Sequence, residues 1–116
     1  MPILEGLKMV RAPRTRLRES EARILALRIA ATLPDNEATT TQIKELMPSY
    51  VALTPIDLEP SDTRPNEQKW QQVVGNVISH IGSSTSIFTK GYAERTDDGL
   101  RVTQAGLSFL DSLEEL

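Results

Sequence analysis

The stretch that decides the fold reads YAERTDDGLRVT and covers residues 92–103. Two short runs with strand character flank the turn-forming residues 96–99, a pattern that predicts a β-hairpin with Gly99 in the left-handed conformation. A loop of this length places Glu94 opposite Arg101, so that opposite charges face each other across the strands. We therefore expect two antiparallel strands joined by a four-residue loop.

The same register gives the hairpin an apolar face, because it places Ala93 opposite Val102. A two-residue Asp-Gly turn would instead place Arg95 opposite Val102, so we expect the longer loop. A lone pair of strands is not stable in water. The hairpin must therefore lie against helices supplied by the rest of the chain.

One such helix follows the hairpin and another precedes it. Residues 104–113 carry leucines at helical spacing, namely Leu107, Leu110 and Leu113. The preceding helix is expected to begin near Pro65 or Asn66 and to end near Ile81 or Gly82. Its apolar stripe consists of Trp70, Val73, Val74, Val77, Ile78 and Ile81. Although Trp70 could stack on a nucleic-acid base, its place on this stripe predicts core packing.

Two further helices are predicted nearer the N-terminus. The first covers about residues 15–33 and has two apolar faces, one with Ile24, Leu27 and Ala31 and the other with Leu25, Ile29 and Leu33. Two such faces predict burial on two sides, either in a dimer or against a further domain. The second begins at Thr39, which forms a capping-box pattern with Gln42. Its apolar stripe consists of Ile43, Leu46 and Met47, and Pro48 is expected to end the helix.

The connection between the second and third helices contains residues that favour one helical turn. Thr54 and Pro55 have the residue types of an N-cap and a first helical position, so one helical turn is expected there. The remainder, from Pro60 to Pro65, is expected to be a loop.

Composition limits the class of protein. The chain has 116 residues and no cysteine, so we expect one domain, no disulfide, no thiolate metal site and a cytoplasmic location. The sequence contains no run of about 18 apolar residues, so no membrane span is predicted. The net charge is −3, but residues 1–28 carry seven basic against three acidic residues. We expect residues 1–14 to form a flexible basic arm and residues 15–116 to form the domain.

The order of these elements predicts an α+β winged helix, with a three-helix core, a hairpin wing and a C-terminal helix. Residues 90–95 and 99–106, KGYAER and GLRVTQAG, resemble the wing and closing helix of many winged helix domains. Residues 53–58, LTPIDL, together with Arg64-Pro65 and the Trp70 helix, resemble the N-terminal domain of Mrr-type restriction endonucleases. The resemblance covers about residues 20–110 and departs from the family at residues 83–90, where a short apolar strand would follow the third helix almost directly.

The resemblance implies binding of double-stranded DNA, with the third helix in the major groove and no nuclease active site in this domain. The polar side of that helix bears Gln68, Gln72, Gly75, Asn76 and Ser79, with Lys69 at its flank and no carboxylate after Glu67. Glutamine and asparagine can pair with adenine, and lysine or arginine with guanine or phosphate. The predicted DNA contacts are Arg64, Gln68, Lys69, Gln72, Asn76, Ser79, Arg95, Arg101, Arg14 and Arg16.

No residue pattern predicts catalysis, so we expect no enzymatic activity, no metal and no cofactor. His80 is the one histidine and has no evident partner. Asp62 with Glu67-Gln68-Lys69 resembles the acidic set of restriction nucleases, but that set requires a strand and here a helix is expected. Asp97 and Asp98 at the hairpin tip would repel phosphate. The alternative is therefore a winged helix that binds another protein or dimerises without DNA.

Overall fold

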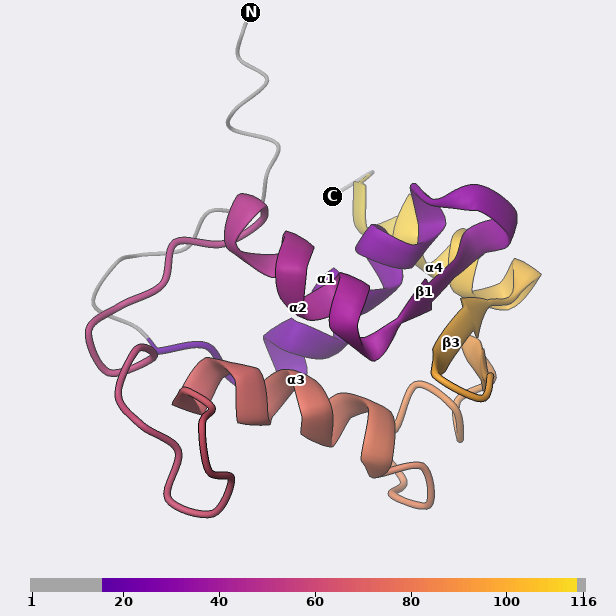
Figure 1. The fold of residues 1–116 in the computed structure, drawn as a ribbon. Helices are drawn as coiled ribbons and strands as arrows, with labels where there is room; N and C mark the ends of the chain where they lie inside the picture. The colour runs from indigo at the N-terminus through magenta and orange to yellow at the C-terminus, as the bar shows by residue number, and fades with distance from the viewer. Residues whose placement is uncertain (1–15, 115–116) are drawn as a thin grey trace, which may run out of the picture.

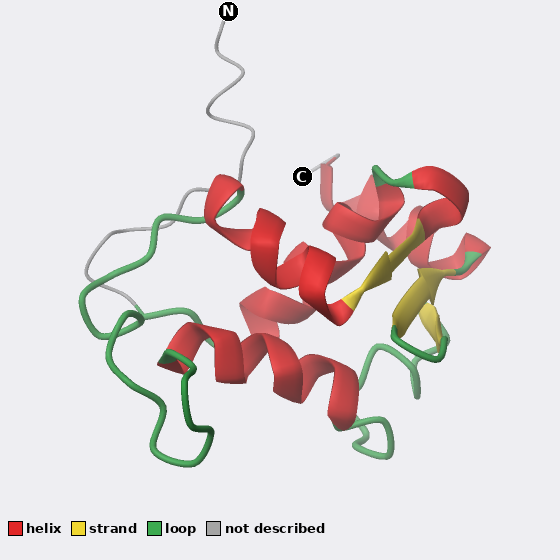
Figure 2. Ribbon diagram, in the orientation of Figure 1, coloured by secondary structure: helices red, strands yellow, loops and turns green. Residues whose placement is uncertain are grey.

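A computed structural model describes residues 16–114 and contains four helices and a three-stranded antiparallel sheet (Figures 1 and 2). The predicted α+β class is thus confirmed. The elements, in chain order, are α1 (Glu19–Ala31), β1 (Glu37–Thr39), α2 (Thr40–Leu46), α3 (Lys69–Ser79), β2 (Ala93–Arg95), β3 (Gly99–Val102) and α4 (Gln104–Glu114). Short 3-10 helices cover Pro34–Asn36 and Met47–Ser49.

Helix α1 is the centre of the fold and is shorter than the predicted helix over residues 15–33. It contacts α3, α4, β3 and α2, so neighbours surround it. Leu27 belongs to one predicted apolar face, Leu25 and Ile29 to the other, and all three are fully buried. Both faces are therefore covered within one chain, and the two-faced pattern does not require a second copy.

A strand that sequence analysis did not predict follows α1. Asp35 and Asn36 have φ values of 60° and 56°, a left-handed conformation that Asp and Asn tolerate better than most residues. They reverse the chain and lead into β1, which pairs with β3 on the side away from β2. The expected lone hairpin is therefore two strands of a sheet with the order β1-β3-β2.

The predicted hairpin register is confirmed, with Ala93 opposite Val102 and Glu94 opposite Arg101. The expected conformation of Gly99 is wrong, since among the described glycines only Gly91 has a positive φ. Gly99 instead begins β3 and pairs with β1. A Cβ at this position would lie 2.7 Å from the Thr39 Cα and would overlap the β1 backbone. The glycine is required by close approach of two strands.

Helix α2 begins as predicted. The Gln42 backbone N–H donates to Thr39 Oγ1 at 3.0 Å, and the Thr39 backbone N–H donates to Gln42 Oε1 at 2.8 Å. This reciprocal pair is a capping box. The helix ends at Leu46, and Pro48 lies in the 3-10 helix that follows. Buried Ile43 and Met47 join α2 to the core.

Helix α3 begins later and ends earlier than the expected bounds near residues 65 and 82. Asn66 has a φ of 66°, which excludes it from a helix, and Gln68 is the extended N-cap residue. The helix ends at Ser79, because His80 leaves the helical conformation. Trp70 is buried as predicted, whereas Ile81 lies beyond the helix and is 49% exposed. Residues 83–90 form turns, with Ile87 buried.

Helix α4 closes the molecule over the span expected from its leucines. Leu110 is buried, while Leu107 and Leu113 pack against the core at its margin. The Phe109 ring stacks on Tyr92, with 4.4 Å between ring centroids. No helix within residues 16–114 is long and apolar enough to span a membrane.

Candidate nucleic-acid interface

The long connection between α2 and α3 folds over the first turns of α3 (Figure 2). At its centre is Asp57, a carboxylate that is 2% exposed. Asp57 Oδ2 accepts hydrogen bonds from the backbone N–H of Thr54, at 2.8 Å, and from its hydroxyl, at 3.1 Å. The Asp57 N–H donates in return to Thr54 Oγ1 at 3.3 Å. The expected helical turn is therefore present, and Leu58 N–H donates to the Thr54 carbonyl.

Asp57 also joins two distant parts of the chain. Its Oδ1 accepts a 2.7 Å hydrogen bond from the Leu17 N–H, and its carbonyl accepts one from the Trp70 N–H. Asp57 is not among the site residues predicted from the sequence. The Thr-x-x-Asp spacing is a capping-box signal and could have identified the reciprocal pair, although not the contact with Leu17.

The N-terminus of α3 is closed by this connection. The N–H groups of Lys69 and Trp70 donate to the carbonyls of Glu59 and Asp57. Gln68, predicted to lie on the polar side of the helix, is the N-cap residue, and its Oε1 accepts a 2.8 Å hydrogen bond from Trp70 Nε1. These first amides are therefore unavailable to a phosphate group, which commonly binds at helix N-termini.

Arg64 covers the middle of α3's polar side. Its Nη1 lies 2.6 Å from the position that a Cβ on Gly75 would occupy, so the glycine leaves room for the guanidinium. Arg64 Nη2 donates to Asn76 Oδ1 at 3.5 Å. Ser61 Oγ donates to Gln72 Oε1 at 2.5 Å. Gln72 and Asn76 are thus half-buried and hold the preceding loop, whereas Ser79 is exposed at the end of the same side.

Two basic residues lie near the start of α3. Lys69 Nζ donates to Glu59 Oε1 at 3.0 Å. This hydrogen bond, together with the negative charge of Glu59, raises the pKa of Lys69 above its ordinary value of 10.5; desolvation and the positive charge of Arg16 oppose this rise, and Asp62 adds to it. Arg16 is exposed and follows directly on the predicted arm. The arm, Arg14 included, lies outside the described residues.

The two predicted wing arginines are both engaged within the sheet. Arg101 forms ion pairs with Glu37 on β1, at 2.5 Å, and with Glu94 on β2, at 3.3 Å. These carboxylates raise the pKa of Arg101, Glu37 first through its hydrogen bond. Arg95 Nη1 donates to the carbonyls of Thr96 and Gly99. Both side chains therefore fasten the hairpin and its neighbouring strand.

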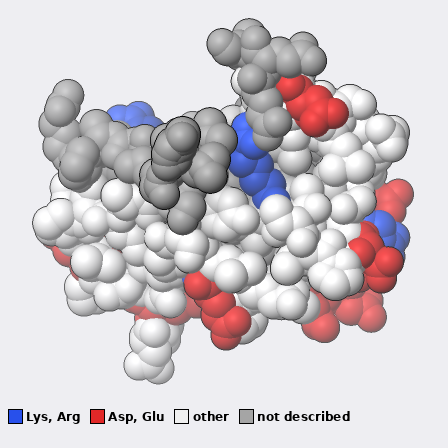
Figure 3. Space-filling model, turned by 90° about the horizontal axis from the view of Figure 1, so that it is seen from above, with Lys and Arg blue, Asp and Glu red and all other residues white. Residues whose placement is uncertain are grey.

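The fold gathers some of the predicted contacts and separates others. Arg16, Arg64, Lys69 and Gln72 belong to the N-terminal half of α3 and its surroundings, while the sheet lies beyond the other end of that helix (Figure 1). On the face drawn in Figure 3, basic side chains form small separate groups and acidic side chains gather along the edges. Figure 3 views the molecule from the side away from α3, and the described basic side chains visible there form no continuous positive band.

Two members of the set that resembles a nuclease site, Glu67 and Lys69, are also engaged. Glu67 accepts a 2.6 Å hydrogen bond from Lys44 Nζ on α2, and Lys69 pairs with Glu59. Neither Glu67 nor Lys69 lies on a strand. Within residues 16–114, no group of three His, Asp or Glu side chains is placed to hold a metal ion.

Comparison with known proteins gives no further assignment: no family model, curated protein or solved structure matches this chain.

Proposed function

We propose that this chain is a winged helix module that binds double-stranded DNA, with α3 facing the major groove. The observation that carries the proposal is the arrangement of elements. The chain runs helix, strand, helix, helix and hairpin, and the sheet order is β1-β3-β2. In such a domain the third helix is presented on one side and the β2–β3 loop flanks it as the wing.

The surface chemistry of α3 supports this orientation. Ser79 is exposed on the side that bears no carboxylate, and its hydroxyl can bond to base edges, whereas Asn76 on the same side is held by Arg64. Lys69 flanks the same side. Arg16 is exposed, and the eleven residues before it contain three further basic groups, Lys8, Arg11 and Arg14. These positive charges would contact phosphate, which supplies most of the sequence-independent affinity.

The resemblance to Mrr-type domains extends the proposal to a biological role. The LTPIDL segment, which carries this resemblance, forms the turn in which Thr54 and Asp57 are hydrogen-bonded to each other beside the start of α3. The module would therefore be a small regulator or the recognition domain of a restriction-type protein, and catalysis would belong to another polypeptide segment or partner.

A fluorescence anisotropy titration with a labelled duplex tests DNA binding directly. We expect a dissociation constant on the order of 1–100 μM at moderate salt, weakening as salt rises because phosphate contacts release counterions. Absence of binding at low salt, or binding that does not change with salt, would refute the proposal.

A matched pair of variants locates the interface. Ser79→Asp places a carboxylate on the proposed DNA-facing side of α3, whereas Ser108→Asp places one on an exposed position of α4. We expect Ser79→Asp to weaken binding at least about fivefold, since like charges across an interface repel. Equal effects of the two substitutions would show that α3 does not face the duplex.

Binding of a protein partner is the second candidate, and specific ion pairs favour it. Lys69 and Arg101 are already neutralised by carboxylates of the same chain, and Asp97 and Asp98 are exposed at the hairpin tip. A DNA-binding wing with this tip would meet phosphate with two negative charges. This alternative predicts no salt-dependent DNA binding, and light scattering would detect a dimer if the partner is a second copy.

A further inference from the structure

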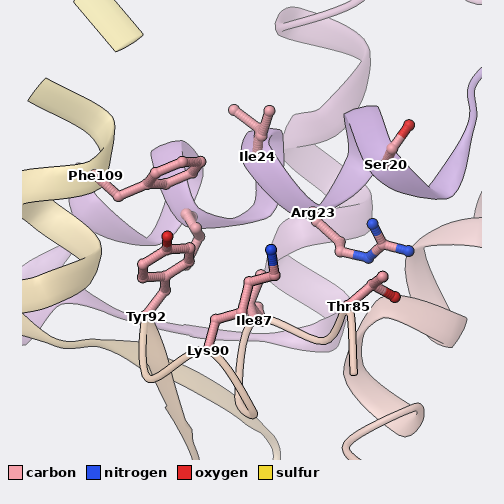
Figure 4. A pocket seen from close by; sticks show the side chains of 9 residues that line it. Ser20, Arg23, Ile24, Thr85, Ile87, Lys90, Tyr92 and Phe109 are labelled. Atoms are coloured by element: carbon pink, nitrogen blue, oxygen red, sulfur yellow. The ribbon is translucent and has the colours of Figure 1, made fainter. Parts of the chain in front are cut away.

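A pocket of about 150 Å³ lies between α1, the turns before β2, and α4 (Figure 4). No residue of α3 lines it, so it is separate from the proposed DNA-facing side. Its apolar lining consists of Ile24, Leu27, Ile87, Tyr92 and Phe109.

The apolar walls are held in place by the fold. Leu27 is fully buried, and Ile87 is 3% exposed. Tyr92 and Phe109 stack with only 9° between their ring planes, and the Tyr92 N–H donates to the Ile87 carbonyl at 2.9 Å. The pocket is therefore formed before any ligand enters, which lowers the cost of binding.

Two cations line the pocket: the Lys90 ammonium lies beside the apolar walls, and the Arg23 guanidinium lies farther from them, toward Thr85 (Figure 4). Figure 4 shows the Lys90 ammonium between the Tyr92 ring and Arg23. Lys90 forms no ion pair with any residue from 16 to 114, whereas Arg23 contacts Glu19 only at 3.7 Å. The Lys90 ammonium has no ion-pair partner among these residues, so it can attract the anionic group of a ligand whose apolar part occupies the cavity beside it.

We propose that this pocket binds a small aromatic carboxylate. Its ring would lie against Tyr92, Phe109 and Ile24, and its carboxylate would contact Lys90 and Arg23. The size supports a ligand with a single ring, because an apolar cavity of about 150 Å³ holds benzene in another protein. This binding site goes beyond the proposed DNA interaction and does not depend on it.

Nuclear magnetic resonance titration of the ¹⁵N-labelled chain tests the proposal with benzoate as the probe. We expect a dissociation constant on the order of 1 mM, as suits a ligand of this size, with shifts concentrated at the amides of the pocket residues. Benzamide keeps the ring without the charge, and acetate keeps the charge without the ring. Each should bind at least about fivefold more weakly at constant ionic strength.

Three outcomes of this titration would overturn the proposal. Acetate binding as strongly as benzoate would indicate a general anion effect, and benzamide binding as strongly would show that the cations contribute nothing. Shifts absent from the pocket at benzoate concentrations of about ten times the expected constant would exclude the site.

Charge variants supply an independent test. Lys90→Gln removes an exposed charge without disturbing the core and should weaken benzoate binding about fivefold. Lys44→Gln removes a charge between α2 and α3, away from the pocket, and should leave the affinity unchanged. Equal affinities for wild type and Lys90→Gln would refute the proposal, whether or not the chain binds DNA.

Discussion

Replacing Asp57 with alanine tests the idea that one buried carboxylate fastens the start of α3 to the rest of the chain. The side chain accepts hydrogen bonds from the N–H of Leu17 and from the N–H and hydroxyl of Thr54, at 2.7, 2.8 and 3.1 Å. All three residues are at most 2% exposed. The substitution leaves these donors in place and removes their acceptor.

The expected loss follows from those contacts. A buried donor without a partner costs about 1–3 kcal/mol, and hydrogen bonds to a charged acceptor lie in the upper part of the range. Water can enter beside exposed Ile56 and Leu58 and satisfy part of the loss. We therefore expect Asp57→Ala to reduce the free energy of unfolding by about 3–5 kcal/mol, a large share of the stability of a small domain.

Urea denaturation followed by tryptophan fluorescence measures this change. Trp70 is the one tryptophan, and it is buried. Its backbone N–H donates to the Asp57 carbonyl, so its fluorescence emission reports on the region that the substitution affects. Asp62→Ala is the matched control, because it removes an exposed carboxylate from the same connection. We expect the control to remain within about 0.5 kcal/mol of wild type.

A reduction of less than about 1 kcal/mol for Asp57→Ala would refute the reasoning, since it is smaller than the cost of one unpaired buried donor. An equal loss in Asp62→Ala would also refute it, because general charge effects would then explain the result.

Three further predictions concern stability and ionisation. Gly99→Ala places a Cβ against the β1 backbone and should cost about 1–3 kcal/mol in thermal unfolding; an unchanged melting temperature would contradict that close contact. Thr39→Ala removes the acceptor for the Gln42 N–H and should lower the free energy of unfolding, measured by urea denaturation, by about 0.5–2 kcal/mol. A smaller loss would show that this N-cap does not stabilise the fold. Glu59→Gln should lower the pKa of Lys69 toward 10.5, measured by NMR titration. Because the pKa of Lys69 is raised in the folded chain, the Lys69–Glu59 pair stabilises the fold at neutral pH, and this stabilisation is lost as pH rises from the pKa of Lys69 in the unfolded chain through its pKa in the folded chain. An unchanged pKa of Lys69 in the variant would contradict this explanation.

The features that sequence analysis predicted correctly depend on neighbouring residues. The Thr39–Gln42 capping box involves two residues within one turn, and the Glu94–Arg101 pairing follows from the loop between them. Burial of Trp70 follows from the helical period of its stripe. Strand β1 could not be predicted this way, because three residues are too few to distinguish an alternating pattern from chance and they become a strand by pairing with β3.

The candidate interface was harder to predict than the fold. The glutamine and asparagine on α3 were selected for their chemistry as free groups, yet Gln72 binds Ser61 and Asn76 binds Arg64. The helical period identifies which side is polar, but it contains no information on whether a loop returns to cover that side. The same limit applies to Arg101, whose partner Glu37 is 64 positions away.

The sequence by itself determined the helices with capping signals and apolar stripes, the hairpin register, and the absence of cysteine chemistry. These properties depend on interactions between residues close in the chain, or on composition alone. Only the tertiary structure decided why residue 99 is glycine, what lies over Gly75, how Asp57 joins Leu17 to α3, and that Lys90 faces an aromatic pocket. Each of these depends on segments far apart in sequence, whose approach is determined by packing of the whole core.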